Sequence, residues 1–131
     1  MARIYVFRRD MRSGFYEYRR MRQTSKTISP TFGRRLRQAR LRADLPQDRL
    51  GVLAGLEESS SSARISRYEG AVHEPPAKFA KQLARVLGVP VAFLYCDDDR
   101  LADIMLSYSS MSEVQRQELL NISKRLSDLN L

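Results

Sequence analysis

Apolar residues recur three or four positions apart along most of this chain, which is the spacing of amphipathic helices rather than of strands. The first such run starts near Thr31 and places Leu36 and Ala39 on one face. Residues 44–46, which read Asp-Leu-Pro, end the run. No stretch alternates strongly enough to require a sheet. The pattern therefore predicts an all-α protein.

Two short helical patterns follow, joined by a turn that contains a glycine. The first opens at Gln47 and reaches Gly55, and the second ends at Gly70. Ile65 and Tyr68 lie three residues apart in the second pattern and are expected to face inward. The rest of that pattern is rich in Arg and Ser. Such a pair of helices is typical of a motif that inserts its second helix into a DNA groove.

The pattern then predicts two more helices before residue 96. Two prolines at residues 75–76 open the first of these, and Gly88 closes it. Residues 91–95 form the other, a short fifth helix. The three aspartates at residues 97–99 precede a further helical pattern, where carboxylates suit the free N–H groups of a helix start.

A last helix is expected to start near Ser110 or Ser112, because each offers a capping box. Its apolar stripe is spaced three, four and three residues apart and consists of Leu119, Ile122, Leu126 and Leu129. A seam shorter than two heptads is not stable as an isolated helix. It must either pack on its own domain or pair with a second chain, and we favour pairing.

Residues 1–30 read as an extension. The segment RIYVF has the composition of a short strand, but no partner strand is visible, and a lone strand is unstable. The remainder is basic and polar, so a flexible arm is the simplest interpretation. The chain thus divides into this extension, a helical domain at residues 31–96 and a helical C-terminal extension at residues 97–131.

Charge is uneven along the chain, whose formal net charge is +8. Residues 1–30 carry eight Arg and Lys against two acidic residues, and residues 31–96 carry eleven against six. Residues 97–131 reverse the sign, with four basic and seven acidic residues. A basic front indicates a polyanionic partner, of which nucleic acid fits best. No stretch has the broad apolar face of a membrane-surface helix.

The signatures of other protein classes are missing. Cys96 is the only cysteine, which excludes an intrachain disulfide and a cysteine-based zinc site and suits a cytoplasmic protein. His73 is the only histidine and lies in a predicted loop. No nucleophile has a base nearby in sequence, so we expect no enzyme activity, no metal and no cofactor. No apolar run is long enough to span a bilayer.

Residues 32–95 resemble the lambda-repressor-like family, also called Cro-type or XRE helix-turn-helix regulators. The resemblance is carried by GRRLRQAR, PQDRLGVLAG, ISRYEG and FAKQLARVLGVPVAFLY, in the family's order. It implies a five-helix DNA-binding domain in which the third helix reads base edges. The partner it implies is double-stranded DNA, bound by a homodimer in a prokaryotic or phage setting.

The resemblance also assigns roles to individual residues. Base-reading positions fall on Ser62, Ala63 and Arg67, with Arg64 between them and able to serve either bases or phosphates. Phosphate-contacting positions fall on Gln47, Ser61 and Ser66. A structural ion pair is expected between Arg40 and Glu69. The exposed Arg34, Arg35, Arg37 and Arg42 adjoin this motif, and we expect phosphate contacts from Arg37 and Arg42 in particular.

Two departures from the family pattern stand out. The small residue of the second helix is Gly51 where the family usually has Ala, which permits close helix crossing but weakens the helix by about 1 kcal/mol. The family places its isoleucine six residues after the turn glycine, whereas Gly55 and Ile65 are ten apart. The additional residues lie within LEESSSS, and residues 56–60 read as a lengthened turn. This leaves the start of the recognition helix open.

The sequence therefore predicts a transcriptional regulator, specifically a repressor that binds an inverted-repeat operator as a homodimer. One rival is an antitoxin or restriction-modification controller whose C-terminal helices bind another protein. A rival of a different class is an interaction adaptor that keeps the fold without reading DNA. Arg64 and Arg67 count against the adaptor, because a protein-binding helix is expected to show apolar anchors. The operator, the regulated genes and any small-molecule effector cannot be read from the sequence.

Overall fold

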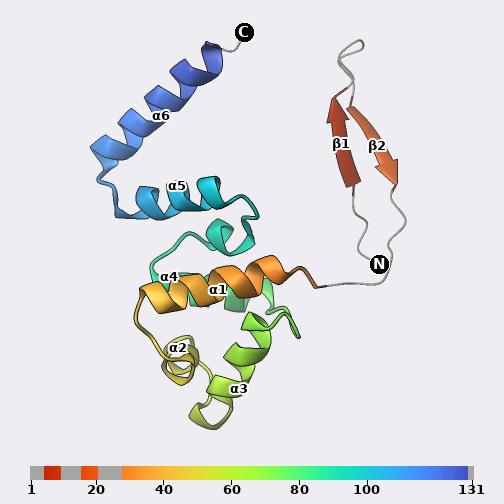
Figure 1. Cartoon of the computed structure of the whole chain (residues 1–131), viewed down its shortest axis with the longest axis vertical. Coiled ribbons are helices and arrows are strands. Elements are labelled where there is room, and N and C mark those ends of the chain that lie inside the picture. The colour runs from red at the N-terminus through yellow and green to blue at the C-terminus, as the bar shows by residue number, and fades with distance from the viewer. Residues whose placement is uncertain (1–4, 10–15, 21–27, 130–131) are drawn as a thin grey trace.

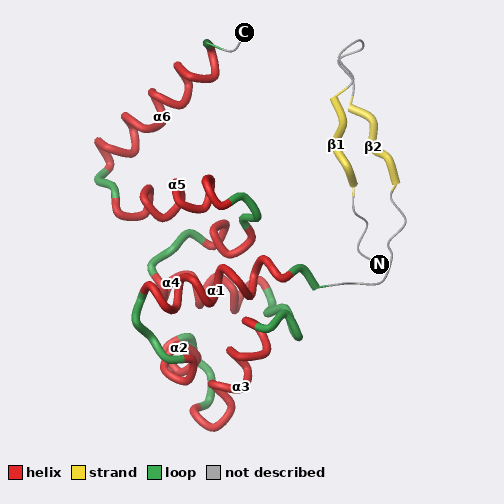
Figure 2. Tube along the Cα trace, viewed as in Figure 1, coloured by secondary structure: helices red, strands yellow, loops and turns green. Residues whose placement is uncertain are grey.

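The computed structural model describes residues 5–9, 16–20 and 28–129. The remaining parts of the predicted arm at residues 1–30 lie outside the described residues. The predicted all-α class is confirmed for the DNA-binding domain and the C-terminal extension, because every regular element within residues 28–129 is a helix (Figures 1 and 2). The helices are α1 (Pro30–Arg42), α2 (Gln47–Leu53), α3 (Glu58–Glu69), α4 (Ala77–Leu87), the 3₁₀ helix η1 (Val91–Tyr95), α5 (Asp99–Ser110) and α6 (Glu113–Asp128).

A two-stranded hairpin precedes the helices. β1 (Tyr5–Arg9) pairs antiparallel with β2 (Tyr16–Arg20), and Phe7 is opposite Tyr18. The sequence-based expectation that the first strand lacks a partner was therefore wrong. The second strand was missed because its two tyrosines alternate with Glu and Arg and give no apolar run, although aromatic residues at alternate positions suit a strand.

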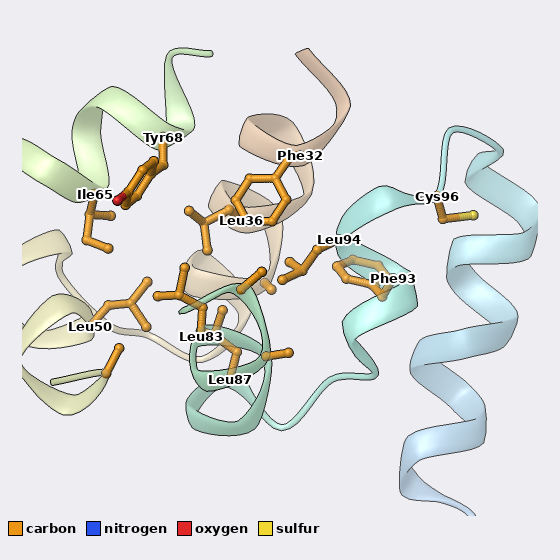
Figure 3. Close-up of a cluster of buried hydrophobic side chains, with 14 of the residues drawn as sticks. Phe32, Leu36, Leu50, Ile65, Tyr68, Leu83, Leu87, Phe93, Leu94 and Cys96 are labelled. Carbon is orange, nitrogen blue, oxygen red and sulfur yellow. The ribbon is translucent and has the colours of Figure 1, made fainter. Parts of the chain in front are cut away.

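One core unites α1 to α4, η1 and the start of α5. Figure 3 shows Leu36, Leu50, Ile65 and Leu83 pointing toward a common centre, and each is fully buried. Burial of Leu36 and Ile65 confirms the inward faces predicted for the first and third helices. The N-cap of α5 is Asp98, which accepts a hydrogen bond from the Leu101 amide. Ser112, rather than Ser110, forms the capping box that starts α6.

The turn between α2 and α3 is short, contrary to the expected lengthened turn at residues 56–60. Gly55 adopts a φ of +99°, and the Leu56 amide then donates to the Gly51 carbonyl at 2.9 Å. The chain reverses at once, and α3 starts at Glu58. The additional residues are helical and lengthen α3 at its N-terminus by about one turn, or ~6 Å. A serine run has no strong helical preference, so packing against α2 decides its conformation.

The contact between α2 and α3 depends on Gly51 and Ser61. Ser61 is fully buried, and its hydroxyl donates to the Asp48 carbonyl at 2.6 Å. A Cβ built on Gly51 would lie 2.0 Å from the Ser61 Oγ and 3.1 Å from its Cβ. A methyl group at Gly51 would therefore displace the Ser61 side chain, whose hydroxyl is held by the Asp48 carbonyl.

Arg35 attaches the start of α5 to α1. The sequence-based expectation placed it among exposed arginines, but its side chain is only 2% exposed. Its Nε donates to the Cys96 carbonyl at 2.8 Å, and its Nη2 donates to Asp99 Oδ1 at 2.8 Å. Nearby, Thr31 donates to the Asp97 carboxylate. The expectation failed because two of the partners of Arg35 are backbone carbonyls far along the chain, which sequence periodicity does not reveal.

We expect Gly51→Ala to destabilise the domain by about 1–3 kcal/mol, because the strain of overpacking exceeds the gain in helix propensity. Chemical denaturation of the purified protein measures the change. The matched variant Ser61→Ala removes the clashing hydroxyl. If the proposed clash is correct, Gly51→Ala combined with Ser61→Ala costs less than the sum of the two single changes. Additive costs would contradict it.

Asp99 gives the protein an acid-sensitive contact. Hydrogen bonds from Arg34 and Arg35, and the charges of both, lower the pKa of this exposed carboxyl below its ordinary value of 3.8. The contact therefore stabilises the fold above that value and is lost as the pH falls through the lowered pKa. We expect Asp99→Asn to be less stable than wild type at pH 6, with the difference shrinking below about pH 4. Denaturant titrations across that range measure it, and a constant difference would contradict the assignment.

Candidate nucleic-acid interface

The outer surface of α3 is polar and accessible. Ile65 and Tyr68 point into the core, which leaves Ser62, Ala63 and Arg67 exposed on the other side. The side chain of Arg67 has no hydrogen-bond or ion-pair partner within the described part of the chain. Its planar donor fork is thus available, and this fork matches the O6 and N7 atoms of guanine in a major groove. Ser66 is also exposed, one position before Arg67.

Arg64 is exposed but held by its neighbours. Its Nη2 donates to the Tyr68 hydroxyl at 3.3 Å, and its guanidinium lies 5.9 Å from the centre of the Phe79 ring. Its charge is therefore directed toward the C-terminal end of α3. There it lines a surface cleft together with Arg67, Tyr68, His73 and Glu74. This geometry separates Arg64 from the exposed Ser62 and Ala63, although the sequence grouped all three.

Ser61 does not belong to this surface. The sequence pattern placed it near phosphates, but it is buried against Gly51 and its hydroxyl is bonded to α2. The additional helical turn explains the difference, because Ser61 is now an interior position of α3 rather than its start.

The added turn brings an acidic tip that sequence reasoning missed. Glu57 is the N-cap of α3 and Glu58 its first residue, and both are exposed. Within the described residues neither carboxylate makes an ion pair or accepts a hydrogen bond. Carboxylates repel phosphates but can accept a hydrogen bond from the amino group of cytosine. The two glutamates are visible in the segment LEESSSS, but their position at the start of α3 follows only once the segment is known to be helical.

A buried polar network fixes α3 against α1 and α2. Arg40 Nε and Nη2 donate to the two carboxylate oxygens of Glu69 at 2.6 and 3.1 Å, with side chains 9% and 5% exposed. Arg40 also donates to the Leu45 carbonyl, and the side-chain Nε2 of Gln47 donates to Glu69 Oε2 at 2.9 Å. Gln47 thus serves this network directly, and one amide hydrogen remains for another acceptor.

Two arginines of α1 present unpaired charges. Arg37 and Arg42 are exposed and make no ion pair with any described residue. Arg34 differs, because it binds Asp99 at 2.9 Å. No described residues cluster in the way a metal ion requires. The surface therefore offers free cations and polar hydrogen-bonding groups, which suit contacts to a nucleic-acid backbone and base edges.

Comparison with known proteins decides the family. Residues 31–93 match the family described as helix-turn-helix domain, and they span α1 to α4 and most of η1. The crystal structure of the transcriptional regulator BswR is similar over 71% of this chain and 92% of that protein, with 43% sequence identity and a TM-score of 0.68. This chain belongs to the helix-turn-helix family. No curated protein matched it.

Membership and the similarity to a transcriptional regulator indicate a DNA-binding regulator of transcription. Both comparisons point to a DNA-binding regulator rather than to an enzyme, in agreement with the sequence-based expectation. Among the described residues, no helix combines the length and apolar character needed to cross a bilayer.

Removing the carboxylate of the buried network tests its structural role. We expect Glu69→Ala to destabilise the protein by about 3–5 kcal/mol, because it leaves the Arg40 charge buried without its partner. Thermal and denaturant unfolding measure the change. Glu74→Ala, at an exposed loop position without such a pair, serves as the control and should change stability little. A loss below about 1 kcal/mol for Glu69→Ala would show that water replaces the carboxylate.

Proposed function

We propose that this helix-turn-helix protein is a sequence-specific repressor that binds an inverted-repeat operator as a homodimer in a prokaryotic or phage cytoplasm. The observation that supports it most is the unoccupied donor fork of Arg67 on the exposed face of α3, because a bidentate arginine is the commonest specific reader of guanine. Repression follows if the dimer occludes a promoter.

The face divides into two roles. Ser62, Ala63 and Arg67 are proposed to read base edges, and Ser66, Gln47, Arg37 and Arg42 to hold phosphates. Arg64, bonded to the Tyr68 hydroxyl and placed beside the Phe79 ring, is proposed to contact a phosphate rather than a base. Glu58 is proposed to face an amino group of cytosine or adenine, since a carboxylate at that tip would be repelled by the backbone.

The homodimer is proposed to use the C-terminal helices. The stripe of Leu119, Ile122, Leu126 and Leu129 buries no residue fully against the chain's own domain, and Ile122 and Leu129 are 38% and 81% exposed. Two-fold symmetry would match two half-sites about one helical turn apart. The second candidate, an antitoxin or restriction-modification controller, rests on the same exposed surface, which would then bind a different protein.

Selection of bound sequences from a random duplex pool tests this function. A palindromic consensus supports the homodimer, a single half-site supports a monomeric reader, and no enrichment contradicts sequence-specific binding. The selected duplex then serves for titrations at several salt concentrations, because phosphate contacts make the affinity fall as salt rises.

We expect Arg67→Ala to weaken binding to the selected site by about 1–3 kcal/mol and to relax preference at one base pair of each half-site. Arg37→Ala is the matched control, because it removes one exposed arginine outside α3. It should weaken all sequences alike and reduce the salt dependence. Unchanged preference after Arg67→Ala would show that another residue of α3 reads that base.

A further inference from the structure

The hairpin of β1 and β2 sorts its residues onto two faces. Opposite positions of an antiparallel pair share a face, as do alternate positions along a strand. Because Phe7 is paired with Tyr18 and Arg9 with Tyr16, one face holds four aromatic positions. Such cross-strand aromatic pairs stabilise an antiparallel ribbon. The full set on this face is Tyr5, Phe7, Arg9, Tyr16, Tyr18 and Arg20.

The two strands are strongly basic. They carry Arg8, Arg9, Arg19 and Arg20 against one carboxylate, that of Glu17. Each strand ends in two adjacent arginines, so antiparallel pairing puts the two arginine pairs at opposite ends of the ribbon. A strand of this length measures about 13 Å, at ~3.3 Å per residue step. The major groove of DNA is about 12 Å wide, so the two ends of the ribbon can reach phosphates on both sides of it.

The hairpin needs a partner beyond its own pairing. A two-stranded ribbon alone is marginally stable in water, and neither strand packs extensively against a described helix. Figure 1 shows the hairpin apart from the helices. A second hairpin is an unfavourable partner, because it would bring four arginines toward four others. A polyanion is favourable, because each phosphate that an arginine neutralises releases counterions.

DNA bound by the helical domain is the polyanion within reach. Residues 21–29 connect β2 to the start of α1. Nine residues span at most about 30 Å when extended, which is close to one helical turn of DNA. The connection also keeps the hairpin near any duplex that the domain holds, which raises its effective concentration there.

Resting on the DNA recognition proposed for α3, we propose that the hairpin is a second DNA contact. Its four arginines bind phosphates of the duplex beside the half-site, without selecting a base sequence. The hairpin thus adds affinity to every duplex, and α3 alone chooses among them. At ~0.9 per phosphate, four such contacts would contribute about 3–4 to the slope of log affinity against log salt.

Replacing the four arginines by glutamine in the full chain tests this contact. We expect the variant to bind both the selected duplex and an unrelated duplex about tenfold or more weakly at low salt, because the lost phosphate contacts are common to both. The salt slope should become shallower by about 2–4 per protomer. Replacing the same four residues by lysine should keep the affinity within about threefold of wild type, since lysine also binds phosphate.

The matched control removes four positive charges elsewhere, at exposed residues outside the hairpin and outside the proposed DNA-facing set. These are Lys78, Lys81, Arg85 and Arg100, each replaced by glutamine. A glutamine variant of the hairpin that binds no more weakly than this control overturns the contact, because net charge alone then explains the loss. Circular dichroism checks that every variant keeps its helices.

Two further outcomes would also overturn the hairpin contact. A lysine variant as weak as the glutamine variant would show that phosphate attraction is not what the arginines supply. A loss confined to the selected duplex would show that the hairpin reads sequence. Failure of the recognition proposed for α3 appears separately, as a wild-type protein that binds the selected and the unrelated duplex equally well.

Discussion

The orientation of α3 depends on one buried ion pair. Arg40 belongs to α1, and Glu69 is the last residue of α3. Both side chains are nearly inaccessible to water. Desolvating two charges costs about as much as their attraction returns, so such a pair contributes little net stability compared with apolar packing. The pair instead makes other orientations of α3 relative to α1 unfavourable. Any rotation of α3 that separates the two groups leaves a charge buried without a partner, and Gln47 joins α2 to the same constraint.

The parts of the fold set by apolar spacing could be predicted from the sequence, and the parts set by single polar contacts could not. Leu36 and Ala39 follow helical spacing, as do Ile65 and Tyr68, so the burial of these residues was predictable. The helical state of the serine run was not, because it depends on how Ser61 packs against Gly51. The burial of Arg35 was hidden for a similar reason, since its backbone acceptors lie some sixty residues away along the chain.

The same distinction holds for the candidate site. Exposure of Ser62, Ala63 and Arg67 follows from the inward direction of Ile65 and Tyr68, which periodicity gives. The position of the guanidinium of Arg64 does not follow from it, because the hydroxyl of Tyr68 and the ring of Phe79 draw the side chain away. A helical wheel identifies which residues leave the core. It does not identify which of them are already bound to a neighbour.

Two arginines position the C-terminal helices relative to the rest of the domain. Arg35 holds the segment before α5 against α1, and Arg116 fixes α6 to the end of α5. Each acts through backbone carbonyls, so it fixes the direction of a helix rather than the position of one side chain. In the proposed homodimer, these two contacts would set the distance between the two α3 helices, and that distance has to match the spacing of the half-sites.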